Sequence, residues 1–167
     1  MTSTRLLVTT YSPNQLIQVN SGGDELRRVP LPDDVNPWHA VESPTATFIV
    51  SHRNTELSRI NILLEQYQIS EVNADGEFLR RFKGSRVSPL GLSRHIAIDS
   101  HGNVIVSDSG NRCILLLDAQ LTLRRVIMDK HQLNHKSPAR MCYSEPTGQL
   151  MVGFQERCVV VFDILRR

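Results

Sequence analysis

Short apolar runs recur along the chain, and polar turns rich in glycine, asparagine and aspartate separate them. Aliphatic and β-branched residues fill the runs, as in His95–Asp99 and Val104–Ser107, and runs of this length and composition are typical of strands. Turn residues such as His101–Asn103 and Asn73–Gly76 join consecutive runs. The pattern predicts an antiparallel all-β protein whose strands are connected by short turns.

Four of these runs end alike and mark a repeat. They are Leu6–Val8, Phe48–Val50, Val104–Val106 and Leu150–Val152. Their valines lie 42, 56 and 46 residues apart, which is about the length of one β-propeller blade. The similarity extends further, since Leu16–Asn20 matches Ile114–Asp118 and an arginine pair closes three of the copies. The chain therefore repeats one unit, which reads as four strands.

The repeat divides a single domain, residues 1–167, into units of about 4–35, 36–92, 93–137 and 138–167. The second unit carries an insertion at 53–68, for which we expect a long loop or a short amphipathic helix. Such an insertion either serves a binding face or is neutral. Counted in strands, the units read as three, four, four and three. We therefore expect an incomplete or open propeller, whose uncapped ends favour self-association.

The best-preserved copy, residues 95–118, resembles the NHL repeat. It has an apolar strand that ends in Asp99, a Gly-Asn turn, a second strand that ends in Asp108, and then Asn111 and Arg112 before another apolar strand. The resemblance implies an NHL-type β-propeller, as in the C-terminal part of tripartite-motif proteins, where such propellers bind proteins or structured RNA on one face. Ubiquitin transfer in those proteins resides in a RING domain, and the Cys/His zinc spacing of a RING is missing here.

The units depart from the family pattern at the end of the second strand. Asp108 stands there in the third unit, and the other units have Thr10, His52 and Phe154. We expect Asp108 and Arg112 to form a structural clamp across the loop. The arginine pairs fall in the fourth strand, where charge protects an outer edge from aggregation; a basic stripe for nucleic acid is the other interpretation.

Composition adds limits to this picture. The 167 residues include 19 basic and 17 acidic side chains, a net charge of +2, which neither requires nor excludes a polyanionic partner. The three cysteines, Cys113, Cys142 and Cys158, lie in apolar runs without zinc-site spacing, so we expect buried thiols. Neither a signal peptide nor an apolar stretch of the ~20 residues that span a bilayer is recognisable. These features predict a cytoplasmic protein with no membrane association.

Two histidines raise the question of catalysis. His39 and His95 lie near the starts of first strands, which line the central opening of a propeller; metal-dependent lactonases and amidating lyases use related propellers in that way. The last unit supplies Arg140 there instead of a further ligand. The sequence therefore predicts no catalytic residue, no metal and no cofactor, with a lactonase- or lyase-type enzyme as an alternative.

The predicted function is a non-enzymatic binding or scaffold module that recognises a protein partner through one loop face. Loops on a rigid scaffold suit this role, and Trp and Arg are typical interface anchors, although Trp38 fits a core position equally well. Candidate contacts in the loops between second and third strands are Tyr11, His52, Arg53, Asn111, Arg112 and Arg157. Those near the starts of first strands are Trp38, Arg94 and Arg140. The alternatives are an RNA-binding propeller, since the arginines suit phosphates, and a truncated fragment without a retained role.

Overall fold

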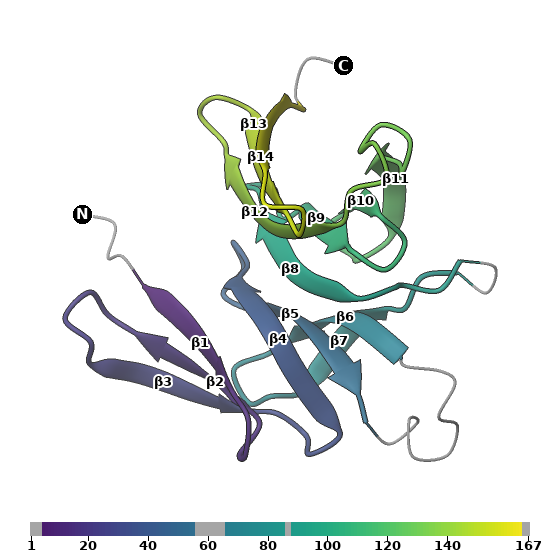
Figure 1. Cartoon of the computed structure of the whole chain (residues 1–167). Coiled ribbons are helices and arrows are strands. Elements are labelled where there is room, and N and C mark those ends of the chain that lie inside the picture. Colours follow the sequence, from purple (N-terminus) through teal and green to yellow (C-terminus); the bar gives the residue numbers. More distant parts are fainter. Residues whose placement is uncertain (1–4, 56–65, 86–87, 165–167) are drawn as a thin grey trace.

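The computed structural model describes residues 5–55, 66–85 and 88–164, which form fourteen strands in four antiparallel sheets (Figure 1). Sheet 1 contains β1 (Leu6–Thr10), β2 (Gln15–Val19) and β3 (Glu25–Pro30). Sheet 2 contains β4 (Val35–Glu42), β5 (Phe48–Asn54), β6 (Gln66–Val72) and β7 (Phe78–Phe82). Sheet 3 contains β8 (Ser93–Ile98), β9 (Val104–Asp108), β10 (Cys113–Leu117) and β11 (Leu123–Met128). Sheet 4 contains β12 (Pro138–Ser144), β13 (Gln149–Phe154) and β14 (Val159–Asp163).

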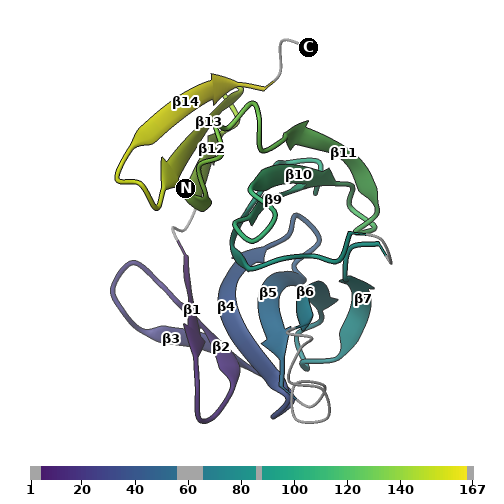
Figure 2. The same cartoon turned by 45° about the vertical axis from the view of Figure 1, so that its right-hand side comes forward.

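The four sheets follow one another around an open arc (Figures 1 and 2). Strand order within each sheet follows chain order, and the first strand β8 contacts both β4 and β12, the first strands of the sheets on either side of it, along the inner side of the arc. Sheet 1, which begins at the equivalent of a second strand, has no inner strand among the described residues. Sheet 4 likewise has no fourth, outer strand there. The predicted all-β fold and the strand counts of three, four, four and three are confirmed.

The hydrophobic core lies between the sheets and consists of three clusters. One lies between sheets 1 and 2 around Leu16 and Phe48, and the next lies between sheets 2 and 3 around Ile69 and Val106. The third lies between sheets 3 and 4 around Leu150. Sheets 2 and 3 are thus covered on both faces, which explains the continuous apolar runs Phe48–Val50, Val104–Val106 and Cys113–Leu117.

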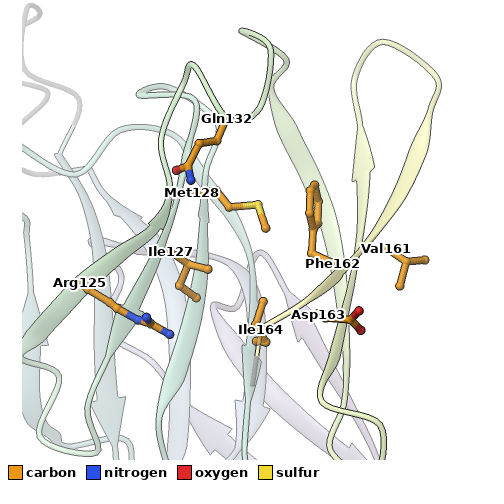
Figure 3. Close-up of a pocket in the computed structure, with 8 residues that line it drawn as sticks. All are labelled: Arg125, Ile127, Met128, Gln132, Val161, Phe162, Asp163 and Ile164. Atoms are coloured by element: carbon orange, nitrogen blue, oxygen red, sulfur yellow. The ribbon is translucent and has the colours of Figure 1, made fainter. Parts of the chain in front are cut away.

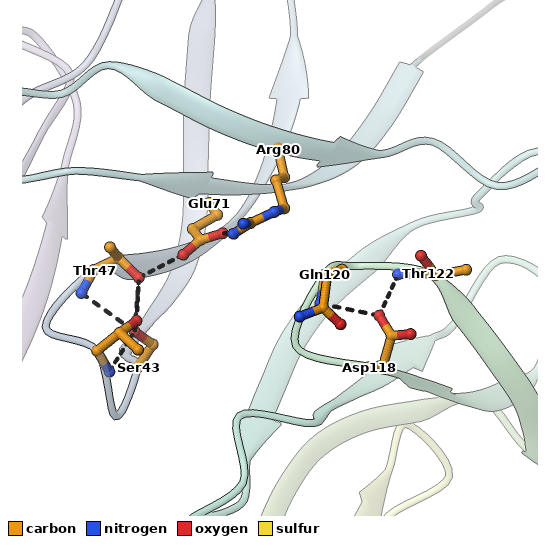
Figure 4. A network of polar contacts seen from close by, with 8 residues as sticks. Ser43, Thr47, Glu71, Arg80, Asp118, Gln120 and Thr122 are labelled. Carbon is orange, nitrogen blue, oxygen red and sulfur yellow. Dashed lines mark hydrogen bonds and ion pairs between the residues drawn. The ribbon is translucent and has the colours of Figure 1, made fainter.

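An asparagine or aspartate makes the same turn between the third and fourth strands of three sheets. One side-chain oxygen of Asn20, Asn73 or Asp118 accepts hydrogen bonds from the backbone N–H groups two and four residues later; Figure 4 shows the Asp118 turn. Gly23 and Gly76 follow at equivalent places with φ of +88° and +85°, a conformation that glycine adopts without strain. This shared chemistry explains why turn residues marked the repeat so clearly.

Part of the insertion in the second unit lengthens a hairpin. Strands β5 and β6 pair from Phe48 and Val72 to Asn54 and Gln66, and each has seven residues, whereas β9 and β10 have five. The two ends of the insertion at 53–68 are therefore strand. Residues 56–65 lie outside the described residues, so the expected loop or helix stays a prediction.

The described residues contain no helix long and apolar enough to cross a membrane. Of the three cysteines, Cys113 and Cys158 are half-buried, and burial raises the pKa of the Cys113 thiol to about 12. Cys142 is exposed. The expectation of a buried thiol was wrong at Cys142, because its side chain lies on the face of sheet 4 that no other sheet covers.

Candidate functional site

The inner strands β4, β8 and β12 share a β-bulge close to their starts. Pairing with the following strand skips one residue in each of them, and such bulges re-aim side chains. The skipped residues are Trp38, Arg94 and Ala139. The residues that follow them are His39, His95 and Arg140. Arg140 is therefore equivalent to His39 and His95, and the equivalent of Trp38 and Arg94 on β12 is Ala139.

The two inner-strand histidines stack on each other across the joint between sheets 2 and 3. The ring centroids of His39 and His95 lie 3.8 Å apart, with 25° between the ring planes. The Nδ1 atom of His39 accepts a hydrogen bond from the Ile96 backbone N–H at 3.4 Å, and Nδ1 of His95 accepts one from the Met141 backbone N–H at 3.3 Å. Because Nδ1 accepts, the ring proton of each histidine resides on Nε2. Each histidine thereby links its sheet to the next.

Both of these histidines are uncharged at neutral pH. Burial lowers the pKa of His39 to about 4, and the nearby His95 and Arg140 lower it further in that direction. The pKa of His95 is also lowered to about 4, by burial and then by Arg140. Two neutral rings can stack without charge repulsion, and they offer Nε2–H donors instead of positive charge.

Trp38 and Arg94 form a second pair beside the histidines. The guanidinium of Arg94 lies over the Trp38 ring, 4.9 Å from its centroid, a cation–π arrangement. Arg94 is exposed and Trp38 is half-buried. The indole Nε1–H of Trp38 is itself buried, and no described residue accepts a hydrogen bond from it. Trp38 is therefore neither a satisfied core residue nor a freely exposed one.

The loops between second and third strands lie beside the segments that lead into the inner strands. The Ser109 N–H donates to the Leu92 carbonyl at 3.0 Å, and the Gln155 N–H donates to the Ser137 carbonyl at 3.1 Å. Both sets of candidate contacts therefore open on one face of the arc. We call this the loop face.

Four predicted contacts are exposed in the loops of that face. They are Tyr11, Asn111, Arg112 and Arg157. Arg112 and Arg157 occupy equivalent positions and take left-handed backbone conformations, with φ of +54° and +59°. Arg140 is exposed as well, on the inner strand β12.

The expected clamp between Asp108 and Arg112 is wrong. The Asp108 carboxylate accepts hydrogen bonds from the Gly91 N–H at 3.1 Å and from the Asn111 N–H and amide at 2.9 and 2.7 Å. The Asn111 amide also donates to the Pro89 carbonyl at 2.9 Å. Asp108 thus holds two loops together through Asn111 and backbone N–H groups, and Arg112 is exposed outside that network.

His52 and Arg53 do not lie in a loop, because β5 continues through both of them. His52 is 1% exposed, and its Nε2 lies 2.8 Å from the Ser70 hydroxyl oxygen. Burial, followed by the charge of Arg81, lowers its pKa to about 4. His52 is therefore unavailable to a partner, and that part of the prediction is corrected; Arg53 is half-buried.

At least three of the six arginines in the outer-strand pairs make contacts within the described part of the chain. Arg28 forms an ion pair with Glu25 at 2.6 Å, and Arg80 pairs with the buried Glu71, which also accepts a hydrogen bond from Thr47 (Figure 4). The guanidinium of Arg81 lies 4.0 Å from the Phe78 ring centroid. These contacts favour the edge-protecting role over a free basic stripe.

Two features were missed by the sequence reasoning. One is the histidine link to the next inner strand, since ring stacking between strands 56 residues apart leaves no local pattern. The other is a cavity of about 380 Å³ between β11 and β14, where sheet 4 has no fourth strand (Figure 3). It is lined by Arg125, Ile127, Met128, Gln132, Val161, Phe162, Asp163 and Ile164. Among the described residues, no three His, Cys, Asp or Glu side chains gather as a metal-ion site.

Antiparallel sheets that follow one another around an axis, with first strands innermost, define the β-propeller fold. No protein-family model and no curated protein matches the chain. Solved structures match it with TM-scores that include values from 0.58 to 0.64. A protein of unknown function from Bacteroides caccae is 17% identical, with a TM-score of 0.60 over 97% of this chain and 54% of that one.

Two further solved structures show the same fold. Catalytically inactive virginiamycin B lyase from Staphylococcus aureus with quinupristin is 13% identical, with a TM-score of 0.64 over 93% of this chain and 46% of that one. Kuenenia stuttgartiensis hydrazine synthase is 13% identical, with a TM-score of 0.64 over 93% of this chain and 54% of that one. The chain therefore spans about half the length of the solved structures it matches. At such identities the likeness shows the propeller fold alone.

Proposed function

We propose that the chain is an NHL-type propeller segment that serves as a non-enzymatic binding module, and that an acidic segment of a protein partner docks on its loop face. The observation that carries the proposal is the pair formed by Trp38 and Arg94. An exposed guanidinium lies over an indole whose N–H has no acceptor among the described residues. A partner carboxylate would pair with the exposed Arg94 guanidinium in a charge-assisted hydrogen bond, which is among the stronger kinds.

The surroundings of this pair support a protein partner. Arg112, Arg140, Arg157 and Tyr11 are all exposed, and tyrosine, tryptophan and arginine dominate the energetics of protein interfaces. The loops are braced by backbone contacts such as Ser109 to Leu92, so little ordering cost is paid on binding. The NHL resemblance of residues 95–118 agrees with such a role.

Capture on the immobilised chain tests the proposal. We expect proteins that are retained by the unsubstituted chain to be lost, by at least about tenfold in quantitative mass spectrometry, from a Trp38→Ala/Arg94→Ala variant; about 1.4 kcal/mol corresponds to that factor. The matched control is Arg124→Ala, which removes an exposed arginine from the outer strand β11 and should retain them.

Nuclease treatment and salt separate the proposal from its alternatives. Retention that survives ribonuclease and weakens only modestly between low and moderate salt supports a protein partner. Ribonuclease-sensitive retention with a steep salt dependence identifies an RNA-binding propeller instead. Equal retention by all three chains places the contact elsewhere, and the absence of any retained molecule would contradict a binding role.

A further inference from the structure

The two terminal sheets each leave one apolar face uncovered. On sheet 1, Leu6 and Val8 are 59% and 45% exposed. On sheet 4, Met151, Val159 and Val161 are 40%, 71% and 52% exposed. Side chains alternate along a strand, so Leu150 and Val152, the chain neighbours of Met151, point to the opposite face and into the core. Each end of the arc therefore presents an apolar sheet face to solvent.

The same repeat positions are buried wherever a neighbouring sheet is present. The equivalents of Val8 are 0% exposed and face the preceding sheet; they are Val50, Val106 and Val152. The equivalents of Met151 in sheets 2 and 3 face the following sheet and are 3% and 2% exposed; they are Ile49 and Ile105. The exposed face of sheet 1 is thus the kind that packs on a preceding sheet, and the exposed face of sheet 4 is the kind that packs on a following sheet.

These two kinds of face pack on each other inside the chain. Ile49 and Val106 belong to the cluster between sheets 2 and 3, and Ile105 and Val152 belong to the cluster between sheets 3 and 4. The uncovered face of sheet 4 is therefore one half of a recurring interface, and the uncovered face of sheet 1 is its other half. Each exposed face thus carries at Val8 or Met151 the kind of apolar residue that one side of an internal joint carries.

The extent of the arc fits two molecules in one ring. The solved propellers are about twice as long as the part that matches this chain, since 54%, 46% and 53% of three of them are covered. Two half-rings related by a twofold axis form two identical seams, and the assembly is then closed instead of growing into a filament. We infer that two copies of this chain join head to tail, sheet 4 of each on sheet 1 of the other, into one ring of eight sheets. This inference does not depend on the proposed partner.

Mass measurement by light scattering during size exclusion tests the inference. We expect a mass of two chains, and mass of one chain for both Met151→Lys and Val8→Glu, because each places a charge in both seams at a cost of several kcal/mol. Leu79→Lys is the matched control, since Leu79 is 48% exposed on the outer strand β7 away from the seams; it should keep the two-chain mass. Circular dichroism of all three variants checks that each of them is folded.

Mixing the two monomeric variants gives a sharper test. In a mixed pair, one seam is unsubstituted and the other places Lys at position 151 opposite Glu at position 8. We expect the equimolar mixture to recover the two-chain mass, whereas each variant alone stays at one chain. Two surfaces that do not meet would give no recovery.

Alkylation of Cys142 provides an independent readout. Its thiol is exposed on the open face of sheet 4, in register with Met151, so a seam would cover it. We expect alkylation to be at least about tenfold slower in the unsubstituted chain than in monomeric Val8→Glu, whose change lies on the other end of the arc. A chain that is monomeric at every concentration, an open-ended polymer, or a dimer that tolerates both Val8→Glu and Met151→Lys would overturn the inference.

Discussion

The middle sheets and the end sheets of this arc are built from the same repeat yet differ in what they bury. In sheet 2, Phe48, Ile49 and Val50 are all buried, because one face packs on sheet 1 and the other on sheet 3. In sheet 1 the equivalent Leu6 and Val8 are exposed. A residue type at a given repeat position therefore does not determine burial; the presence of a neighbouring sheet does, as nearest-neighbour models of repeat proteins describe.

Polar contacts also follow the joints between sheets. The Gln18 amide donates to Glu42 at 2.6 Å between sheets 1 and 2, and the Ser51 hydroxyl donates to the Ser93 carbonyl at 2.5 Å between sheets 2 and 3. The Ser109 hydroxyl donates across the next joint to the Pro138 carbonyl. Every joint is thus held by apolar packing and by at least one hydrogen bond, which is worth about 1 kcal/mol when satisfied.

The largest expected difference in stability is between removing a leucine side chain from a covered sheet face and removing one from an uncovered sheet face. Leu150 is 0% exposed and Leu6, its repeat equivalent, is 59% exposed. We expect Leu150→Ala to lower the free energy of unfolding by about 2–5 kcal/mol and Leu6→Ala by less than about 1 kcal/mol. Urea unfolding of both, in a Met151→Lys background that keeps copies apart, measures the difference. Equal losses would show that the face of sheet 1 is covered within one chain.

The repeat made the fold predictable from the sequence. Matching runs at Val8, Val50, Val106 and Val152 yielded the four sheets, and the position of the first and last runs within the unit yielded the missing strands. The alignment reached this far because strand and turn chemistry is local: alternation, apolar runs and the Asx-type turns are each readable within a few residues.

The candidate site was predicted less completely, for physical reasons. The bulges in β4, β8 and β12 place Arg140 level with His39 and His95 and one residue after the level of Trp38 and Arg94, and no residue type marks such a bulge. Asp108 is paired with Gly91 and Asn111 instead of Arg112, and Cys142 is exposed because no sheet covers its face of sheet 4. Backbone handedness, register and the number of neighbours are set by the assembled sheets, and residue type alone does not report them.

The equivalent turn glycines Gly23 of sheet 1 and Gly76 of sheet 2 differ in how closely a neighbouring backbone approaches them. A Cβ on Gly76 would lie 2.0 Å from the Pro30 carbonyl oxygen, whereas a Cβ on Gly23 would meet nothing within 4 Å. We expect Gly23→Ala to cost about 1 kcal/mol for its left-handed conformation alone, and Gly76→Ala to cost at least about 2 kcal/mol because sheet 1 must also shift. Thermal unfolding of the two variants measures the gap, and equal costs would contradict close packing at that joint.

Acid should weaken the middle of the arc more than its ends. The pKa values of His39, His52 and His95, all in sheets 2 and 3, are lowered from 6.5 to about 4. Between those values the unfolded chain binds protons that the folded chain does not, so stability falls as pH decreases from about 6.5 to about 4. The buried His52 contributes about 1.4 kcal/mol per pH unit, and the partly solvated His39 and His95 contribute less.

Urea midpoints at neutral and mildly acidic pH measure this effect. A His52→Gln variant should have a shallower pH dependence, and hydrogen exchange should locate the acid-induced opening in β4 to β11. A dependence that is unchanged in His52→Gln would assign the effect to other groups.

The smallest expected effect is local and independent of neighbours. Arg112 in sheet 3 and Arg157 in sheet 4 both hold a left-handed conformation, which costs a residue other than glycine about 1–2 kcal/mol. Replacing either by glycine should raise stability by up to about 1 kcal/mol, since the greater freedom of glycine in the unfolded chain offsets part of the gain. Similar increases in the thermal unfolding temperature of both variants would show that backbone strain, unlike burial, does not depend on position in the arc. A decrease for the Arg157 variant alone would contradict this.

The bulge on each inner strand has a consequence for how the arc can be varied. The skipped residue is excluded from ladder pairing, so neither its size nor its β-propensity disturbs the alignment of the strands around it. The chain carries an indole, a guanidinium and a methyl group at these three places without altering the sheets. The side chain at each bulge can therefore be changed in one sheet at a time while the strand pairing stays the same. Substituting new side chains at these positions is a route to designed binding specificity.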